Sequence, residues 1–362
     1  MTPSQNAPTP QKIIIVGAGI IGASLAWHLV QAGASVTIVA TTPGGEATPN
    51  SFAWINASWG NPEFYFHFRR RSMAAWKRLA KALPSLPLKW CGGLCWDLPP
   101  EELDSFASGH SAWGYGIKRL GPTEINEIEP CLAAAPPFAL HVAEEGAVEP
   151  QEAANILLSD AVRNGATLLS GIEVQRLATE NGRVIGIETA DGVMAADVVV
   201  LAAGAGTVTL AASAGIEIPL QSPPGLIVHS KPVRPLLAGL VLAPELHMRQ
   251  TADGRIIAGS DFAGTDPGEN PQQAAEELFT KVKAMLRGSA DLELDFYTVG
   301  HRPTPQDGLP IIGTVKDMPG VYLAVTHSGV TLAPIIGLLG AAEITDRTDD
   351  TSLKPFRLAR FG

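Results

Sequence analysis

The hydrophobic pattern is clearest between residues 13 and 39. Four β-branched residues at 13–16 predict a buried strand, residues 20–32 have the length and apolar content of a helix, and residues 34–39 predict a second strand. This order predicts a βαβ unit with both strands parallel in one sheet. Because residues 13–30 contain no Lys, Arg, Asp or Glu, hydropathy alone also fits a membrane span of about 18–20 residues.

Three glycines favour the βαβ unit over the membrane span. Gly17, Gly19 and Gly22 follow the first strand with GxGxxG spacing. In a dinucleotide-binding unit the first permits a tight turn, the second lets the backbone approach a pyrophosphate, and the third lets the helix pack closely on the sheet. The helix N-terminus then faces the phosphates. The acidic residue expected about 20 residues further on, which binds a ribose, is replaced by Ala40.

The α/β pattern returns in the middle of the chain. A helix is predicted at 150–164, a strand at 167–170, a hairpin at 184–195 and an almost wholly apolar strand at 196–204. The last strand is typical of the middle of a parallel sheet, because both of its faces must be buried. These segments extend the sheet that begins with the βαβ unit.

Two other stretches carry short strand-like pieces, prolines and acidic helix starts, which predict a second domain inserted into the first. We therefore predict an α/β protein with a Rossmann-like dinucleotide-binding domain and an interleaved α+β domain, built from a mixed antiparallel sheet and helices. The expected divisions are a flexible tail at 1–12, a first domain at 13–83, 145–219 and 295–362, and a second domain at 84–144 and 220–294.

Length and charge exclude several classes of function. A chain of 362 residues, 46% of them apolar, supplies cores for two domains. The formal net charge of −10 argues against a nucleic-acid partner or an anionic membrane surface, because phosphate binding needs clustered cations. The short basic cluster Arg69, Arg70 and Arg71 lies in a segment at 63–83 with helical periodicity, and we interpret it as a solvated helix face.

The cysteines indicate a reducing compartment. Cys91, Cys95 and Cys131 are too few for a disulfide framework, and a CxxxC pair without companion ligands does not predict a metal site. The first dozen residues lack the basic region of a signal peptide. We expect a cytoplasmic protein with no metal and no transmembrane segment.

Five blocks occur in order along the chain. They are the glycine fingerprint, the polar loop at 45–51, the sequence Gly-Ala-Val-Glu-Pro at 146–150, the strand ending in Ala203 and Gly204, and the terminal blocks around Arg302 and His327. Together they resemble the D-amino-acid oxidase (DAO) superfamily of FAD-dependent oxidoreductases, which includes glycine oxidase, sarcosine oxidase and D-amino-acid dehydrogenase. The resemblance spans nearly the whole chain.

The resemblance implies a set of FAD-binding residues. The loop at 45–51 would wrap the pyrophosphate, Val174 would meet the adenine, and Gly329 would begin the helix that faces the pyrimidine edge of the flavin. Because no cysteine lies near that terminal block, non-covalent FAD is expected. The full expected set is Gly17, Gly19, Ile21, Gly22, Gly45, Ala47, Thr48, Asn50, Ser51, Val174, Ala203, Gly204, Gly329, Val330 and Thr331.

The resemblance also implies a substrate site. Arg302 matches the position that holds the substrate carboxylate in glycine oxidase, and a guanidinium fork suits that task; the alternative is a structural ion pair. His327 is either a hydrogen-bond donor to the cofactor or a packed residue. Trp54 and Asn56 would form a wall of the substrate pocket, unless they are ordinary core residues. Arg249 would be a second anion anchor or a surface residue.

The function implied is oxidation of the C–N bond of an amino acid or related amine by hydride transfer to flavin N5, followed by hydrolysis of the imine. Oxygen or another acceptor would reoxidise the flavin. One alternative is a flavin-binding subunit of an opine- or hydroxyproline-type dehydrogenase, in a hetero-complex or a homo-oligomer. Another is an NAD(P)-dependent dehydrogenase, against which the loop at 45–51 and the strand ending in Ala203 and Gly204 argue.

Overall fold

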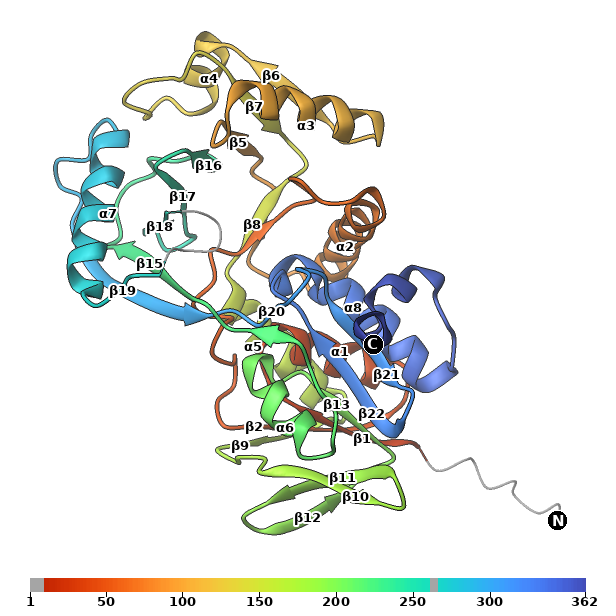
Figure 1. Ribbon diagram of the computed structural model, residues 1–362. Helices are drawn as coiled ribbons and strands as arrows, with labels where there is room; N and C mark the ends of the chain where they lie inside the picture. The colour runs from red at the N-terminus through yellow and green to blue at the C-terminus, as the bar shows by residue number, and fades with distance from the viewer. Residues whose placement is uncertain (1–9, 261–265) are drawn as a thin grey trace.

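Two large sheets organise the molecule. The computed structural model describes residues 10–260 and 266–362, so most of the expected tail at 1–12 lies outside the described residues. A six-stranded sheet forms one lobe and an eight-stranded sheet forms the other, and the chain passes between them several times (Figure 1). We call them the parallel-sheet lobe and the antiparallel-sheet lobe.

The six-stranded sheet has the order β21-β22-β13-β1-β2-β9. Its neighbours run parallel except for the β21–β22 pair, which is antiparallel. The apolar strand predicted near residue 200 lies between two parallel neighbours, which explains why it carries no polar face. The strands are β1 (Lys12–Val16), β2 (Ser35–Ala40), β9 (Thr167–Ser170), β13 (Val198–Leu201), β21 (Ile311–Val315) and β22 (Met318–Val325).

Side chains of alternate residues in β1 belong to two different cores. Ile13 and Ile15 pack with three helices on one face, which are α1 (Ile20–Gln31), α5 (Pro150–Arg163) and α8 (Gly329–Asp346). Ile14 and Val16 pack on the other face, with α6 (Thr207–Ala212) and a three-stranded sheet. That sheet consists of β10 (Arg176–Glu180), β11 (Arg183–Thr189) and β12 (Gly192–Ala195). Because successive side chains of a strand point to opposite faces, β1 contributes to the cores on both faces of the sheet.

The interpretation of residues 13–30 as a membrane span is wrong for this fold. The segment is divided between β1, a turn and the 12-residue helix α1, none of which is long enough to cross a bilayer. Within the described residues, α8 alone is long and apolar enough to cross a membrane. In this structure 67% of its apolar window is buried, and α8 packs against α1 and α2 (Glu63–Ala82) as a core helix.

The eight-stranded sheet has the order β19-β15-β18-β17-β16-β5-β7-β6. Only the β16–β5 pair is parallel, and α7 (Pro271–Met285) packs against one face. Two further helices of this lobe are α3 (Pro100–Ala112) and α4 (Pro122–Ile128). The strands are β5 (Gly93–Cys95), β6 (Ile117–Leu120), β7 (Ala139–Val142), β15 (Pro224–Ser230), β16 (Leu240–Ala243), β17 (Leu246–Gln250), β18 (Ile256–Gly259) and β19 (Leu294–His301).

One strand crosses a boundary expected from sequence. β19 stays paired with β15 from Leu294 to His301, past the division expected at residue 294. The continuous hydrogen-bond ladder therefore carries the chain directly from one lobe to the other, and Arg302 follows at the junction.

Short elements complete the junction and the terminal segment. A three-stranded sheet lies beside α2, and a two-stranded sheet follows β19. Their strands are β3 (Trp54–Ile55), β8 (Gly146–Val148), β4 (Leu88–Lys89), β14 (Leu220–Gln221) and β20 (Thr304–Pro305). Three 3₁₀ turns are η1 (Gly204–Gly206), η2 (Thr351–Phe356) and η3 (Leu358–Phe361).

Candidate active site

A cavity of about 370 Å³ opens where β1, β2, β13 and β22 end. Ligands bind at the carboxyl ends of the strands in open α/β sheets. We call this space the larger cavity. Most of the expected cofactor residues line it: Gly17, Gly19, Ile21, Gly45, Ala47, Thr48, Ser51, Val174, Ala203, Gly204, Gly329 and Val330.

The glycine fingerprint is required by close backbone contacts. Gly17 has φ +108°, and a Cβ there would lie 2.4 Å from the carbonyl oxygen of Ala202. A Cβ on Gly22 would lie 2.0 Å from the carbonyl oxygen of Gly17. Gly22 therefore lets α1 pack on the preceding turn and does not itself line the cavity. Thr48 accepts a hydrogen bond from the Ile20 N–H at 3.1 Å and so holds the polar loop against the start of α1.

Besides Gly22, two further expected cofactor residues do not line the larger cavity. The Asn50 side chain donates to the Glu46 carbonyl oxygen at 2.8 Å, and Asn50 packs beside Gly300 without lining the larger cavity. Thr331 lines a second, adjoining cavity and donates to the Trp54 carbonyl oxygen at 3.0 Å. Both residues therefore support the walls of the site through neighbouring backbone.

At the end of β2, Ala40 stands where an acidic residue that binds the ribose was expected. Ala40 lines the larger cavity with no polar side chain. The Ile172 N–H bonds to the Ala40 carbonyl oxygen at 3.3 Å, so the segment after β9 runs alongside this strand end. Glu173 then lines the cavity next to it. An acidic residue is thus present in this region, on the exposed loop after β9 instead of on β2.

A cavity of about 130 Å³ adjoins the larger one, and we call it the smaller cavity. Ser51, Arg302, His327 and Val330 line both spaces, so these residues form the boundary between them. The other described residues that line the smaller cavity are Phe52, Ala53, Trp54, Asn56, Ser58, Trp59, Asn61, Arg69, Ser328 and Thr331. Trp54 and Asn56, which were expected in the wall of a substrate pocket, are among the residues that line the smaller cavity.

His327 is a half-buried, neutral imidazole on this boundary. Its burial, and then the positive charges of Arg69 and Arg302, lower its pKa to about 4. The Nε2 atom lies 3.1 Å from Ser328 Oγ, and Nδ1 has no hydrogen-bond partner among the described residues. Ser328 Oγ accepts from Arg69 and keeps both a second lone pair and its own hydrogen, so His327 Nε2 can donate to it or accept from it, according to the tautomer. The Nδ1 atom is left for one hydrogen bond at the boundary, in the opposite role to Nε2.

Arg69 corrects the interpretation of the basic cluster as a solvated helix face. Its exposed fraction is 5%, and it lines the smaller cavity. Arg70 and Arg71 fit the expectation better, because they pair with Glu144 and Asp350 at the surface. The helical spacing of apolar residues around Arg69 could have predicted its burial. Tyr65, Met73 and Trp76 lie at helical distances from Arg69 on the buried face of α2.

A buried carboxyl group supports the wall behind Trp54. Glu145 Oε2 accepts from Trp54 Nε1 at 2.8 Å, and Oε1 accepts from Ser58 Oγ at 2.7 Å and from the Tyr115 hydroxyl at 2.5 Å. Burial raises the pKa of Glu145 to about 7, although these donors oppose the shift. Glu145 has no local sequence signal, because its partners are 30 to 91 residues away along the chain.

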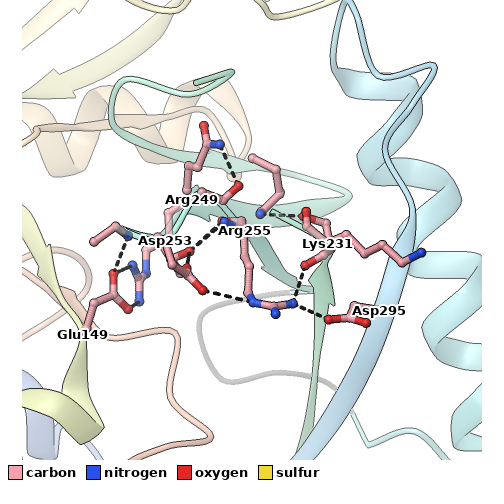
Figure 2. Close-up of polar contacts among 12 residues, drawn as sticks. Glu149, Lys231, Arg249, Asp253, Arg255 and Asp295 are labelled. Carbon is pink, nitrogen blue, oxygen red and sulfur yellow. Dashed lines mark hydrogen bonds and ion pairs between the residues drawn. The ribbon is translucent and has the colours of Figure 1, made fainter. Parts of the chain in front are cut away.

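Arg249 does not lie at either cavity, so it is not placed to act as a second substrate anchor. Its exposed fraction is 3%. It donates to Glu149 at 2.9 Å and to the Phe52 carbonyl oxygen at 2.7 Å. Figure 2 shows it facing Glu149, beside a separate group in which Arg255 lies between Asp253 and Asp295. The guanidinium therefore connects the two lobes.

The comparisons with known proteins assign the fold and the cofactor. A family model described as FAD dependent oxidoreductase (DAO) matches residues 12–343. The chain belongs to the DAO family. It is therefore an FAD-dependent oxidoreductase that acts on amino acids or amines. This finding confirms the expected fold class and cofactor.

Individual relatives match this DAO-family chain over most of its length. Glycine oxidase from Pseudomonas putida is 26% identical over 90% of this chain and 92% of its own. An opine oxidase subunit from Agrobacterium tumefaciens is 25% identical over 96% of each chain. The crystal structure of glycine oxidase from Geobacillus kaustophilus superposes with a TM-score of 0.86 at 25% identity, covering 97% of this chain and 99% of that one.

The residues of the larger cavity fit FAD. Gly17 and Gly19 add no side chains to the turn between β1 and α1, and both line the larger cavity, which suits the approach of a pyrophosphate. The start of α8 at Gly329 presents a helix N-terminus, which favours negative charge. None of the three free cysteines lines the larger cavity, in keeping with non-covalent FAD.

Proposed function

We propose that the enzyme oxidises the C–N bond of a small amino acid or secondary amine in the smaller cavity. One observation carries the proposal. The smaller cavity adjoins the FAD-type cavity at a boundary that includes Arg302 and His327. A substrate carboxylate held by Arg302 would therefore lie beside the cofactor space.

Each residue at the boundary has a distinct task in this proposal. Bound FAD supplies an acceptor for the hydride that leaves the substrate carbon next to nitrogen. Arg302 would bind the carboxylate with two parallel N–H bonds, which fixes the position and rotation of the substrate. His327 is neutral near pH 7, because its pKa is lowered to about 4, so it is a weak base and suits orientation of a bound group better than removal of a proton.

The walls of the smaller cavity favour a small substrate. Its volume of about 130 Å³ is below the roughly 300–1,000 Å³ typical of sites for drug-sized ligands. Trp54 and Trp59 supply apolar surface, and Thr331 and Ser328 supply hydroxyl groups from the start of α8. The two tryptophans would exclude water from the reacting carbon. The imine product would then hydrolyse after it leaves the cavity.

The test is anaerobic bleaching of the bound flavin. The purified holoenzyme should be yellow, and a suitable compound from a panel of glycine, sarcosine, proline derivatives, opines and both enantiomers of common amino acids should bleach it without oxygen. Readmitting oxygen would then show whether oxygen is the acceptor. A holoenzyme whose flavin no amine on the panel reduces would contradict the proposal.

A second candidate is a flavin-binding subunit of an opine-type enzyme. The similarity to the opine oxidase subunit over 96% of each chain favours it. This candidate predicts that a second protein copurifies with the chain at low ionic strength and that the isolated chain reduces its flavin but reoxidises it slowly in air. In either case we propose a cytoplasmic location, because Cys91, Cys95 and Cys131 are free thiols.

A further inference from the structure

The smaller cavity is lined by two arginines that come from different parts of the chain. Arg302 follows β19, and Arg69 lies on α2. One arginine is enough to hold the single carboxylate of a simple amino acid. The second therefore needs its own explanation.

The hydrogen-bond partners of Arg69 are all neutral groups. Its Nε and Nη2 atoms donate to the backbone and side-chain oxygens of Asn56 at 3.1 and 2.7 Å. Its Nη1 atom donates to Ser328 Oγ at 2.8 Å and to the Tyr65 hydroxyl at 3.4 Å. A guanidinium group has five N–H donors, so one hydrogen on Nη2 remains. These bonds fix the group in place without neutralising its charge.

The charges around Arg69 leave it uncompensated within the described residues. No carboxylate there lies within ion-pair distance of it. Glu145 acts on it only from further away, and the Glu145 carboxyl group already accepts three hydrogen bonds from other residues. A buried cation without a partner is costly. An anion in the cavity would offset that cost.

The lining of the smaller cavity also matches a ligand with more than one negative charge. Its described residues contain two arginines and no Asp or Glu. His327 contacts the same space as a neutral group, and its pKa is lowered by both arginines, so both positive charges act on one location. The rest of the polar lining consists of hydroxyl and amide groups.

We propose that Arg69 is a second anion anchor and that the preferred substrate is an amino acid or secondary amine with two carboxylate groups. The inference rests on the proposed function, in which Arg302 binds the carboxylate next to the reacting carbon. Arg69 then binds the distal carboxylate with its remaining N–H and its charge. Substrate choice is then set in part by α2.

The first experiment compares substrates that differ only in charge. Glutamate with glutamine and aspartate with asparagine, in both configurations, are nearly isosteric acid and amide pairs, and iminodiacetate with sarcosine adds a secondary-amine pair. The rate of anaerobic flavin reduction at low substrate concentration should favour the acid at least tenfold in one or more pairs. Equal rates within every pair that reacts, or a preference for the amides, would overturn the proposal.

Variants of α2 separate anion binding from a structural role. Arg69→Gln should bring the acid-to-amide ratio close to one, whereas Arg69→Lys should retain part of the preference. Arg70→Gln is the matched control. Arg70 lies on the same helix, pairs with Glu144 and lines neither cavity, so the ratio should not change. If Arg69→Gln slows both members of a pair equally, Arg69 is structural and the proposal fails.

A binding measurement separates this inference from the proposed function. Malonate and succinate, compared with acetate and propionate, carry no amine, and their binding can be followed through the absorbance spectrum of the bound flavin. The diacids should bind at least tenfold more tightly to the wild-type holoenzyme, and Arg69→Lys should reduce the difference. A diacid preference without reduction by any amine would refute the proposed function alone, whereas turnover of amines without a diacid preference would refute the second anchor alone.

Discussion

At the scale of single residues, the proposed function depends most on Arg302. The residue lies at the boundary of both cavities. Arg302→Met should weaken binding of carboxylate substrates by about 1.5–3 kcal/mol, because a charge-assisted hydrogen bond is lost. Arg302→Lys should recover only part of this loss, since an ammonium group lacks the fork geometry. Titration of anaerobic flavin reduction measures the effect, and an unchanged apparent affinity would show that Arg302 does not hold the substrate.

Glu145 makes the stability of the protein depend on pH. Its pKa in the folded protein is about 7, compared with the ordinary value of 4.5. The folded state therefore holds this proton more tightly, so the contribution to stability is greatest below pH 4.5 and is lost as pH rises to 7. The loss is on the order of 3 kcal/mol.

Replacing Glu145 with glutamine tests this dependence. The variant has no proton to lose, so the difference in unfolding free energy between wild type and variant should shrink by that amount between pH 5 and pH 8. Because the Trp54 N–H would face the amide nitrogen, we expect a loss of about 1–3 kcal/mol at pH 5. Denaturant unfolding at both pH values measures it, and parallel pH profiles would show that Glu145 does not titrate in this range.

At the scale of elements, the start of α1 is set by one close backbone contact. A Cβ on Gly22 would lie 2.0 Å from the Gly17 carbonyl oxygen, so Gly22→Ala must move the helix away from the glycine turn. We expect a loss of about 1–3 kcal/mol in unfolding free energy, as in other overpacked sites, and weaker FAD binding. Flavin fluorescence titration and denaturant unfolding measure the two effects.

Gly109 provides the matched control for that variant. It lies inside α3, and a Cβ there would have no heavy atom within 4 Å. Gly109→Ala should therefore leave FAD affinity unchanged and raise stability by up to about 1 kcal/mol, because alanine favours helix more than glycine does. Equal effects of the two substitutions on FAD affinity would contradict a specific role for Gly22.

Contact between α2 and α8 explains why the smaller cavity forms where it does. Ser72 donates to the Thr331 carbonyl oxygen at 2.6 Å, and Trp76 donates to the Val330 carbonyl oxygen at 2.9 Å. Arg69 lies one turn earlier on α2 and reaches Ser328. One face of α2 is thus fixed to the first turn of α8, which also contributes to the larger cavity.

At the scale of the whole molecule, Arg249 connects the two lobes. It lies on β17 of the eight-stranded sheet and pairs with Glu149, at the start of α5 (Figure 2). Arg249→Met should cost on the order of 1–3 kcal/mol, because Glu149 loses its charged partner and the buried Phe52 carbonyl oxygen loses its donor, although the partly exposed Glu149 keeps the Ala252 N–H. Glu149→Gln and the double variant complete a double-mutant cycle by denaturant unfolding. A coupling energy near zero would show that the pair does not stabilise the molecule.

Sequence periodicity and glycine spacing determined much of the fold. α1, α2 and α5 end within one residue of the predicted helical segments, because local hydrophobic spacing and terminal residues specify a helix. The fingerprint indicated the cofactor cavity, because its glycines are needed by contacts within a few residues of chain. The resemblance to the DAO family added Arg302 and His327, which both lie at the cavity boundary.

The tertiary structure alone decided the tasks of the charged residues. Three consecutive arginines look alike in sequence, yet the packing of α2 against α8 buries Arg69 and leaves Arg70 and Arg71 with surface partners. Arg249 already pairs with the carboxylate of Glu149, which lies 100 residues earlier in the chain. Burial and long-range pairing determine what a charge does, and neither is encoded in the local pattern around a residue.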